Sequence, residues 1–470
     1  MSGVTIPELA ADLKALGVSL APEPELPRGV CPPEAMLDRW ARAAALAEPA
    51  VRQAAIWAIR AAAHAAGLVP ASIHDLYVAR GKGAWQDKTV PAMNLRGWTY
   101  QTCRAAFRAA RKRQAGLLIF EQALGEWLYA VQPPAEYTAA VLAAGLREGH
   151  RGPIFLQADH DQVSAERYAQ DPEKEMERLA AVIREQIAAS FFNIDIDAST
   201  IVDLELPTLL EQQRLNAELT ARFTRLVRTL EPGGVTVSVG AEIGEVGAHN
   251  TTPDELRAFM ATYSRALEAA GGGAGITKVS VNSGTYHGGK VLPDGTLARV
   301  PVAFDTLAEI SRVGRAEFGL AGAVQHGAST LPMDYFGKFP ESGTVEIHLA
   351  LGFNNLIFDH PQLPQAVKDE IRAYCFAHHA HERKPDQTEA QFLYTTRKKA
   401  WAGMKQRFWD LSEEIQETLM GSLEEMFGQM FDRMKVGGTE ALVRQHTRPQ
   451  AIPVPMPEGL AAALGGSSAR

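Results

Sequence analysis

The stretch GPIFLQADHDQ (residues 152–162) places Asp159, His160 and Asp161 directly after an apolar run. The apolar part, residues 152–157, is typical of a short buried strand, so the charged cluster comes where that strand ends. In sheets whose strands are joined by helical crossovers, the carboxyl ends of the strands usually carry the chemistry. The stretch therefore predicts both a parallel sheet and a functional site at one end of it.

Short apolar runs recur on both sides of this stretch and alternate with segments of helical periodicity, such as residues 172–190 and 252–270. This alternation predicts a parallel α/β sheet with right-handed crossovers. Eight strand candidates over roughly 270 residues favour a (β/α)8 barrel, also called a TIM barrel, over an open doubly wound sheet. No Gly-x-Gly-x-x-Gly follows the first run, so a dinucleotide site is not indicated. The predicted strands are residues 89–94, 116–122, 152–157, 191–196, 235–242, 275–282, 321–326 and 353–358.

Four segments are expected along the chain. They are a helical N-terminal extension (1–88), the barrel (89–365), a helical C-terminal extension (366–440) and a flexible tail (441–470). The C-terminal extension is expected to contain one long helix over about residues 391–435. Its apolar residues recur at helical spacing, which predicts packing in the core or between the subunits of a homo-oligomer rather than a cofactor site. These residues are Leu411, Ile415, Leu419, Met426 and Met430.

Composition narrows the class of protein. The chain has 470 residues, 46% of them hydrophobic and 22% charged, and a net charge of −8. An acidic balance argues against a nucleic-acid or membrane-surface partner, and no apolar run is long enough to span a bilayer. The three cysteines, Cys31, Cys103 and Cys375, lack metal-type spacing and their odd number argues against a disulfide framework. A cytoplasmic enzyme with a small-molecule substrate is expected.

Metal-capable side chains stand at the ends of several predicted strands. His160 ends the third, Glu242 ends the fifth, His287 follows the sixth and His326 ends the seventh. In a barrel all four would project at the carboxyl-end face. Three imidazoles and a carboxylate suit a borderline divalent ion such as Zn²⁺, and ligands drawn from distant strands leave room for a substrate. The pattern predicts a catalytic zinc site, although each histidine taken alone is more often structural.

Glycines surround two of these histidines and indicate a second feature. Gly288 follows His287 directly, and Gly327 follows His326. Glycine lets backbone N–H groups approach a bound oxyanion, and Lys290 and Ser329 could add donors. Late-strand loops of (β/α)8 barrels often bind phosphate, so a phosphate site is one interpretation and ordinary turn glycines are the other.

The motifs LQADHD, VSVGAEIGEVG, NSGTYHGG and AVQHGAS, in this order, resemble the metal and phosphate motifs of class II fructose-bisphosphate and tagatose-bisphosphate aldolases. The similarity covers about residues 89–360. It implies a (β/α)8 barrel and a reversible retro-aldol cleavage of a sugar phosphate, as in glycolysis. The metal ligands it implies are His160, His287 and His326, with Glu242 as an additional or alternate ligand.

The same resemblance implies roles for other residues. Asp159 would be the acid/base for the hydroxyl proton next to the bond that is cleaved, which agrees with the position of a carboxylate beside a metal ligand. Gly288, Gly327 and Ser329 would contact phosphate. Asn94, within VPAMNLRGW, would contact the substrate.

Three positions depart from the family pattern. After the fifth strand, His249 and Asn250 stand where the family has a proton-abstracting glutamate, so either Glu245 or His249 would serve instead or the step would be altered. The second-strand motif has Glu121 in place of a serine. The last-strand motif, usually Asn-Ile-Asp-Thr-Asp, is read as LIFDH, in which only Asp359 is retained and the phosphate-binding hydroxyl is absent.

Fructose 1,6-bisphosphate is the first substrate to expect. The departures keep a metal-dependent sugar or sugar-phosphate epimerase or isomerase open as an alternative. A non-catalytic, aldolase-like partner subunit is a third possibility, against which the full set of metal ligands argues.

Two further clusters are interpreted as structural. Asp195 and Asp197 would be helix-capping residues or would orient a ligand histidine. The histidines of residues 375–384 would belong to a solvated linker.

Overall fold

A computed structural model describes residues 4–20, 23–244, 249–284, 291–298 and 301–465. Its centre is a closed barrel of eight parallel strands, in the order β2-β3-β4-β5-β6-β7-β8-β9, with β9 pairing back to β2. The predicted (β/α)8 barrel is confirmed. The strands are β2 (Val90–Asn94), β3 (Ile119–Ala123), β4 (Gly152–Gln162), β5 (Asn193–Asp197), β6 (Ser238–Glu242), β7 (Lys278–Ser280), β8 (Ala323–Gln325) and β9 (Glu346–Leu349).

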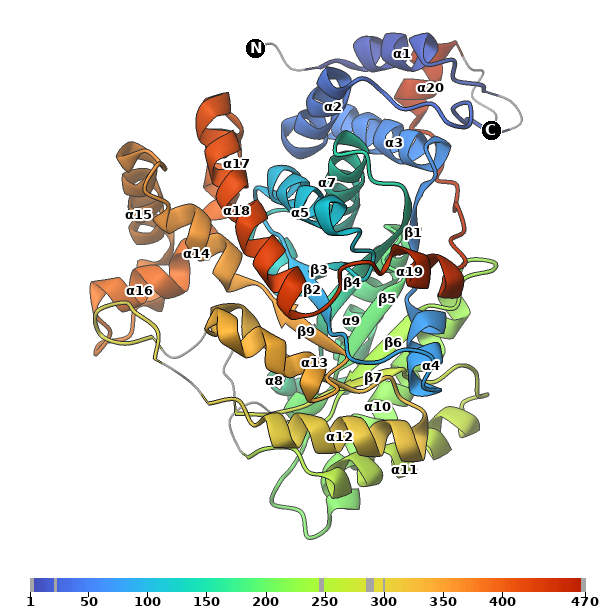
Figure 1. Cartoon of the computed structure of the whole chain (residues 1–470), viewed down its shortest axis with the longest axis vertical. Helices are drawn as coiled ribbons and strands as arrows, with labels where there is room; N and C mark the ends of the chain where they lie inside the picture. Colours follow the sequence, from blue (N-terminus) through green and yellow to red (C-terminus); the bar gives the residue numbers. More distant parts are fainter. Residues whose placement is uncertain (1–3, 21–22, 245–248, 285–290, 299–300, 466–470) are drawn as a thin grey trace.

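Helices between the strands surround the barrel (Figure 1). Many begin with a capping residue: Thr208 and Thr252, for example, each form a capping box with a glutamate three residues later. The larger helices are α5 (Thr99–Arg113), α7 (Pro134–Arg147), α9 (Pro172–Ala188), α10 (Leu209–Leu230), α11 (Pro253–Ala269), α12 (Phe304–Phe318) and α14 (Leu351–Asp359). The short ones are α6 (Leu124–Tyr129), α8 (Ala165–Gln170) and α13 (Lys338–Glu341).

The eighth strand does not lie where the sequence analysis placed it. Residues 353–358 belong to helix α14, and the strand is β9, residues 346–349, with the sequence EIHL. Its apolar residues, Ile347 and Leu349, alternate with Glu346 and His348, and all four are buried. Such a strand contains no continuous apolar run, because the barrel interior is polar at this level.

Polar side chains fill the interior of the barrel. Lys278 of β7 donates from Nζ to Asp195 Oδ2 at 2.8 Å, to Gln157 Oε1 at 2.8 Å and to Glu346 Oε1 at 2.5 Å. The side chain of Lys278 is 1% exposed. Gly240 of β6 makes room for this group, since a Cβ there would lie 2.3 Å from the Asp195 carboxylate. A buried ammonium paired in this way is stabilised only while its partners remain charged.

Part of the N-terminal extension packs against helix α7 on the outside of the barrel, and its last helix, α4, lies at the amino end of the barrel. It comprises α1 (Ile6–Ala15), α2 (Glu34–Leu46), α3 (Pro49–Ala65), β1 (Leu68–Ala71) and α4 (His74–Gly81). Strand β1 was not predicted; it pairs with the first half of β4, below the point where β5 begins to pair. From α4, Tyr77 donates to the Glu346 carboxylate, and Arg80 donates to the carbonyl oxygens of Ala321 and Gly343.

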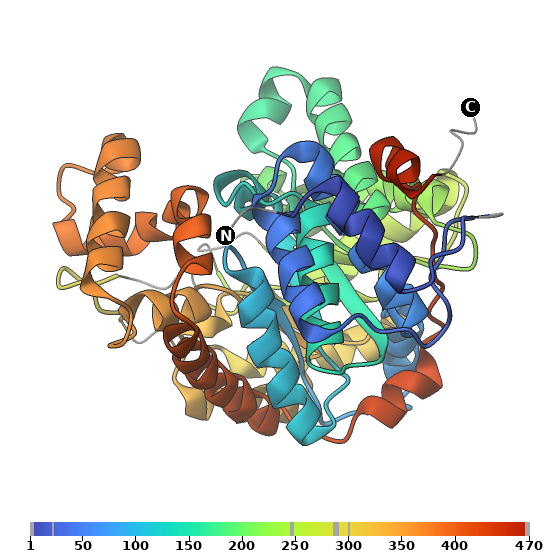
Figure 2. The same cartoon turned by 90° about the horizontal axis from the view of Figure 1, so that it is seen from above.

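The C-terminal extension consists of α15 (Gln365–His379), α16 (Glu389–Thr396), α17 (Trp401–Trp409) and α18 (Glu413–Arg433), and the tail that follows it contains α19 (Glu440–His446) and α20 (Glu458–Leu464). The single long helix expected over residues 391–435 is therefore wrong, because the chain turns between α16, α17 and α18. The orange helices α15 and α16 project to one side in Figure 2.

Helix α18 packs against α5 of the same chain, with Leu419 and Met430 buried. Helix α20 packs against α1, and its Leu460 is fully buried. Within the described residues, no helix is both long and apolar enough to cross a lipid bilayer.

His150, between α7 and β4, provides a test of the packing around the barrel. Burial lowers the pKa of this histidine to about 4, and its ring lies 5.0 Å from the ring of Phe107. The unfolded chain takes up a proton at His150 near pH 6.5 and the folded chain does not, so this contribution to stability is present above pH 6.5 and is lost as the pH falls to 4.

His150→Phe is therefore expected to reduce the loss of stability between pH 6.5 and 4 by about 1–2 kcal/mol relative to the wild type. The measurement is the free energy of unfolding by urea at several pH values. The same substitution at His381, whose side chain is 75% exposed, is the control. An identical pH dependence in the wild type and in His150→Phe would contradict the prediction.

Candidate metal centre and pocket

Strand β4 carries a β-bulge at its carboxyl end. Its residue Ala158 pairs with Ile194 of β5 and Asp161 pairs with Ile196, so Asp159 and His160 together face one residue of β5. His160 has a left-handed backbone conformation, with φ of 50°. In a regular strand consecutive side chains point to opposite faces, and the bulge removes this constraint. Asp159 and His160 both reach the mouth of the barrel, while Asp161 accepts a hydrogen bond from Gln186 of helix α9.

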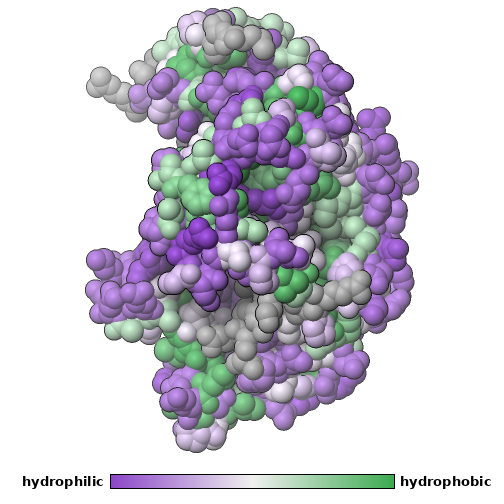
Figure 3. Space-filling model, turned by 90° about the vertical axis from the view of Figure 1, so that its left-hand side faces the viewer, coloured by the Kyte–Doolittle hydropathy of each residue, from purple (hydrophilic) through white to green (hydrophobic). Residues whose placement is uncertain are grey.

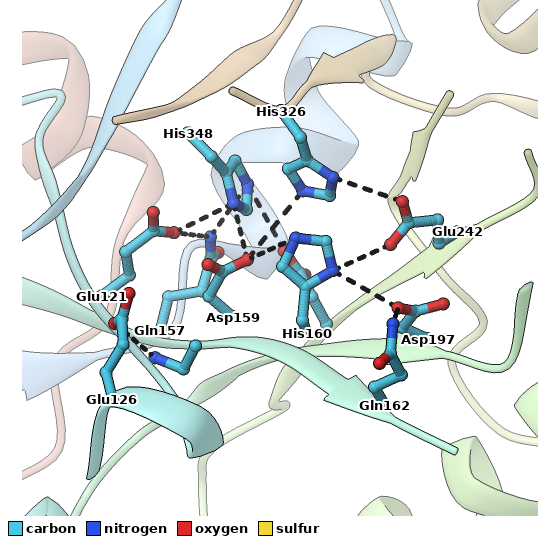
Figure 4. A network of polar contacts seen from close by, with 12 residues as sticks. Glu121, Glu126, Gln157, Asp159, His160, Gln162, Asp197, Glu242, His326 and His348 are labelled. Atoms are coloured by element: carbon cyan, nitrogen blue, oxygen red, sulfur yellow. Dashed lines mark hydrogen bonds and ion pairs between the residues drawn. The ribbon is translucent and has the colours of Figure 1, made fainter. Parts of the chain in front are cut away.

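Three imidazoles meet at this mouth (Figure 4). They come from His160 of β4, His326 after β8 and His348 of β9. The ring centre of His326 lies 4.0 Å from that of His160 and 4.2 Å from that of His348. His348 was not predicted, because its strand was misplaced; the alternation of polar and apolar residues in EIHL is the signal that identifies it.

Carboxylates bridge the imidazoles. Glu242, at the end of β6, has one oxygen 3.0 Å from His160 Nδ1 and the other 3.3 Å from His326 Nδ1. Asp159 Oδ1 lies 2.8 Å from His348 Nδ1 and 3.5 Å from His160 Nε2. Asp197, at the end of β5, lies 3.4 Å from His160 Nδ1. It is therefore placed to orient that ring, one of the two roles predicted for Asp197.

The donor set fits a divalent metal. Ligand atoms of His160, Glu242 and His326 lie within 4.8 Å of one another, as do those of Asp159, His326 and His348. A tetrahedral Zn²⁺ with bonds of about 2.0–2.2 Å holds its ligand atoms about 3.3–3.6 Å apart, close to the two distances from Glu242. His160, Glu242 and His326 are the group that would hold the ion, and His348 and Asp159 stand beside it.

The cluster has an excess of negative charge. Burial disfavours the charged imidazole of His160, but Asp159 and Glu242 outweigh this effect and raise its pKa. Burial likewise opposes a charge on His348, but Glu121 and Asp159 raise its pKa well above the usual value. The site therefore favours a positive charge among its carboxylates, which a divalent cation would also supply.

A cavity of about 170 Å³ opens beside the cluster. Its lining includes the predicted residues Asp159, His160, His326, Gly327 and Ser329. The described lining residues that were not predicted as site residues are Arg96, Glu121, Ala123, Glu126, His348, Ala350, Leu351 and Lys398. Figure 3 shows the side of the molecule that lies to the left in Figure 1, where hydrophilic residues cover much of the surface. A cavity with a metal-capable cluster and charged walls suits a small polar substrate.

Other predicted residues lie elsewhere. Asp359 ends helix α14, its side chain is 61% exposed, and it accepts a bidentate contact from Arg397 outside the cavity lining. The strand after which Asp359 was placed is a helix, which removes the reason for assigning it to the substrate. Asn94 ends β2 and is buried, and it is not among the residues that line the cavity. His249 is half-exposed and contacts Glu255 at 2.9 Å, away from the cluster.

Four predicted residues fall outside the part of the chain that the structure describes. They are Glu245, His287, Gly288 and Lys290. The histidines of residues 375–384 lie at the end of α15 and in the turn after it, where His379 contacts Glu382 at 3.0 Å.

Comparisons with known proteins place the fold. The sequence matches no protein-family model and is not significantly similar to any curated protein. Solved structures do match. One is the fructuronate-tagaturonate epimerase UxaE from Cohnella laeviribosi, at 11% identity and a TM-score of 0.52, over 80% of this chain and 85% of the epimerase chain. Another is a probable tagatose 6 phosphate kinase from Sinorhizobium meliloti, at 17% identity and a TM-score of 0.50, over 80% and 97% of the two chains.

The matched structures also include aldolases. The fructose-bisphosphate aldolase from Campylobacter jejuni matches at 15% identity and a TM-score of 0.46, over 79% of this chain and 97% of that one. The two structures that match with TM-scores of 0.50 and 0.52 share the barrel fold with this chain, and at 17% and 11% identity the likeness is one of fold alone.

Proposed function

We propose that the protein is a metal-dependent aldolase that reversibly cleaves a ketose bisphosphate, with fructose 1,6-bisphosphate as the first candidate, to dihydroxyacetone phosphate and an aldehyde. One observation carries the proposal. His160, Glu242 and His326, which lie on or directly after three different strands, converge at the carboxyl-end mouth of the barrel, with Asp159 beside them. Carboxyl-end loops are the site of chemistry in this architecture.

The residues of the cluster and the cavity have different roles in the proposed reaction. A bound divalent cation would supply Lewis-acid chemistry at the carbonyl oxygen of the substrate. Asp159 would take the proton from the hydroxyl next to the carbon–carbon bond that breaks and return it in the reverse direction. His348 would hold the Asp159 carboxylate in place through its Nδ1, which lies 2.8 Å away. Gly327 and Ser329 would line the phosphate end of the pocket, as the motif resemblance implies.

A sugar epimerase is the second candidate, and two observations favour it. The residues at the end of the last barrel strand, Leu349 and Ala350, carry no hydroxyl for a phosphate. Among the described residues that line the cavity, the lysine and arginine side chains, Arg96 and Lys398, both lie near Tyr129. One cationic wall suits one anionic group better than the two phosphates of a bisphosphate.

The test is cleavage of fructose 1,6-bisphosphate by the full-length protein, with zinc content measured on the same samples. Cleavage is expected to stop on chelation, to return on addition of zinc, and to be lost together with bound zinc in His160→Ala. The exposed His381→Ala is the control and is expected to retain both. Absence of cleavage by a protein that holds zinc would refute the bisphosphate assignment, and NMR detection of hexuronate epimerisation would then support the second candidate.

A further inference from the structure

Lys398 differs from its neighbours in the basic run Arg397–Lys398–Lys399 of the C-terminal extension. Arg397 is paired with Asp359, and Lys399 with Glu382 at 2.5 Å. Lys398 has no ion pair or hydrogen bond with any residue in the described part of the chain, and it lines the cavity of the metal-capable cluster. The two outer cations thus hold the extension together, and the middle one faces the site.

The chain around Lys398 is fixed against the barrel. Trp401, three residues on, is fully buried, with its ring 4.9 Å from that of Phe358. The same indole covers Gly97, which has a left-handed φ of 79° and no room for a side chain, since a Cβ would lie 2.1 Å from the indole ring. Gly97 directly follows Arg96. The close approach therefore brings the extension to the same wall of the cavity as Arg96.

Arg96 and Lys398 make this wall positive. Arg96 is buried, and its guanidinium contacts Glu126 at 2.6 Å and the hydroxyl of Tyr129. The Arg96 guanidinium carbon lies 6.0 Å from the centre of the Tyr129 ring, and Lys398 Nζ lies 5.8 Å from the same centre. Two cations with one close carboxylate, Glu126, leave a surplus positive charge next to the cavity.

This surplus is unfavourable in the free protein. Burial, and after it the charge of Arg96, lowers the pKa of Lys398, so the fold holds the ammonium at a cost. A partly buried charge without a partner is stabilised when an anion binds beside it. Lys398 reaches the pocket from outside the barrel strands, and its neighbours already satisfy the structural ion pairs. A role in binding accounts for its position, whereas a role in holding the extension does not.

We propose that Lys398 and Arg96 form a subsite for one anionic end group of the substrate, a carboxylate or a phosphate ester, supplied in part by the C-terminal extension. The inference rests on the proposed function, because it takes the cavity beside the metal-capable cluster as the place where a sugar binds. It adds that the substrate carries a negative charge at the end away from the reacting carbonyl. Lys398 is a specificity-determining residue in this arrangement.

The experiment measures binding by calorimetry to full-length, zinc-loaded protein carrying Asp159→Asn, so that bound sugar is not turned over. Three ligands share one carbon chain and differ at its end: D-tagatose, D-tagaturonate and D-tagatose 6-phosphate. Lys398→Gln is expected to weaken binding of the charged ligand by about 10- to 100-fold and to leave D-tagatose unchanged. Lys399→Gln, next in the chain but paired with Glu382, is the matched control and is expected to change none of the three affinities.

The charged ligand that binds more tightly identifies the end group as a carboxylate or a phosphate. Equal affinity for the charged and neutral sugars would overturn the proposal, and so would an equal effect of Lys398→Gln and Lys399→Gln. Zinc content distinguishes the proposed function from the proposed subsite. Failure of the protein with Asp159 intact to hold zinc refutes the proposed function, whereas a zinc-loaded protein without a preference for charged sugars refutes only the subsite.

Discussion

Asp159→Asn is expected to lower kcat for cleavage of fructose 1,6-bisphosphate by about 10²- to 10⁴-fold while zinc remains bound. The substitution preserves the shape of the side chain and removes its ability to accept a proton. Asp159 lies at the centre of the cluster, between His160 and His348, and its side chain is only 10% exposed. His160, Glu242 and His326 form a ligand group that does not include it. Initial rates and zinc content, measured together, test the prediction.

Asp161→Asn is the matched control, because the bulge of β4 turns this neighbouring carboxylate away from the pocket and toward Gln186 of α9. It is expected to change kcat by less than a factor of two to three. If Asp159→Asn kept full activity, the proton would be moved by another group. If Asp159→Asn lost its zinc, Asp159 would be a metal ligand and the second group, with His326 and His348, would be the one that holds the ion.

Lys278→Met is expected to cost about 3–5 kcal/mol in the free energy of unfolding, because it removes the ammonium from two buried carboxylates, Asp195 and Glu346, and leaves them only the imidazole of His348 as a counter-charge. Burial alone would lower the pKa of Lys278, but Asp195 and Glu346 raise it, so the ammonium is charged in the folded protein. Removal of the ammonium would also favour protonation of the two carboxylates. Urea unfolding at pH 7, followed by circular dichroism, measures the loss.

A double-mutant cycle isolates the interaction. Lys278→Met combined with Glu346→Gln is expected to recover part of the loss, since the second change removes one of the two carboxylates that the ammonium of Lys278 had balanced. The exposed pair Lys399–Glu382 supplies the control cycle, and its coupling is expected to be below about 1 kcal/mol. A cost for Lys278→Met no larger than that of the surface pair would show that the barrel interior admits water or relaxes around the missing charge.

Most of the barrel is predictable because its strands are short, apolar and separated by amphipathic helices. Strands β2 to β8 were expected at or within a few residues of their positions. Strand β9 was missed because its inward residues, Glu346 and His348, belong to the polar interior, and the continuous apolar run that follows it is a helix. Periodicity alone cannot separate a short buried strand from a buried helix.

The site residues that were predicted are those that belong to local sequence motifs. His160, Glu242 and His326 come together as expected, because strand ends in a closed parallel barrel share one face. The sequence did not indicate Lys398 as a site residue, because no local motif links it to Arg96, about three hundred residues earlier in the chain. The shape of the bulge at His160 also escaped prediction, because it depends on the register of two strands rather than on either sequence.

The seal formed by α4 at the amino end of the barrel bears on how the chain folds during synthesis. Tyr77 and Arg80 leave the ribosome before the groups that they contact, Glu346 and the carbonyl oxygens of Ala321 and Gly343, which lie 269, 241 and 263 residues further on. At about 5–20 residues per second, this interval lasts roughly 12–54 seconds. During this interval Tyr77 and Arg80, which are buried in the finished protein, remain exposed on the first helices. This is the period in which a chaperone would be most useful to the nascent chain.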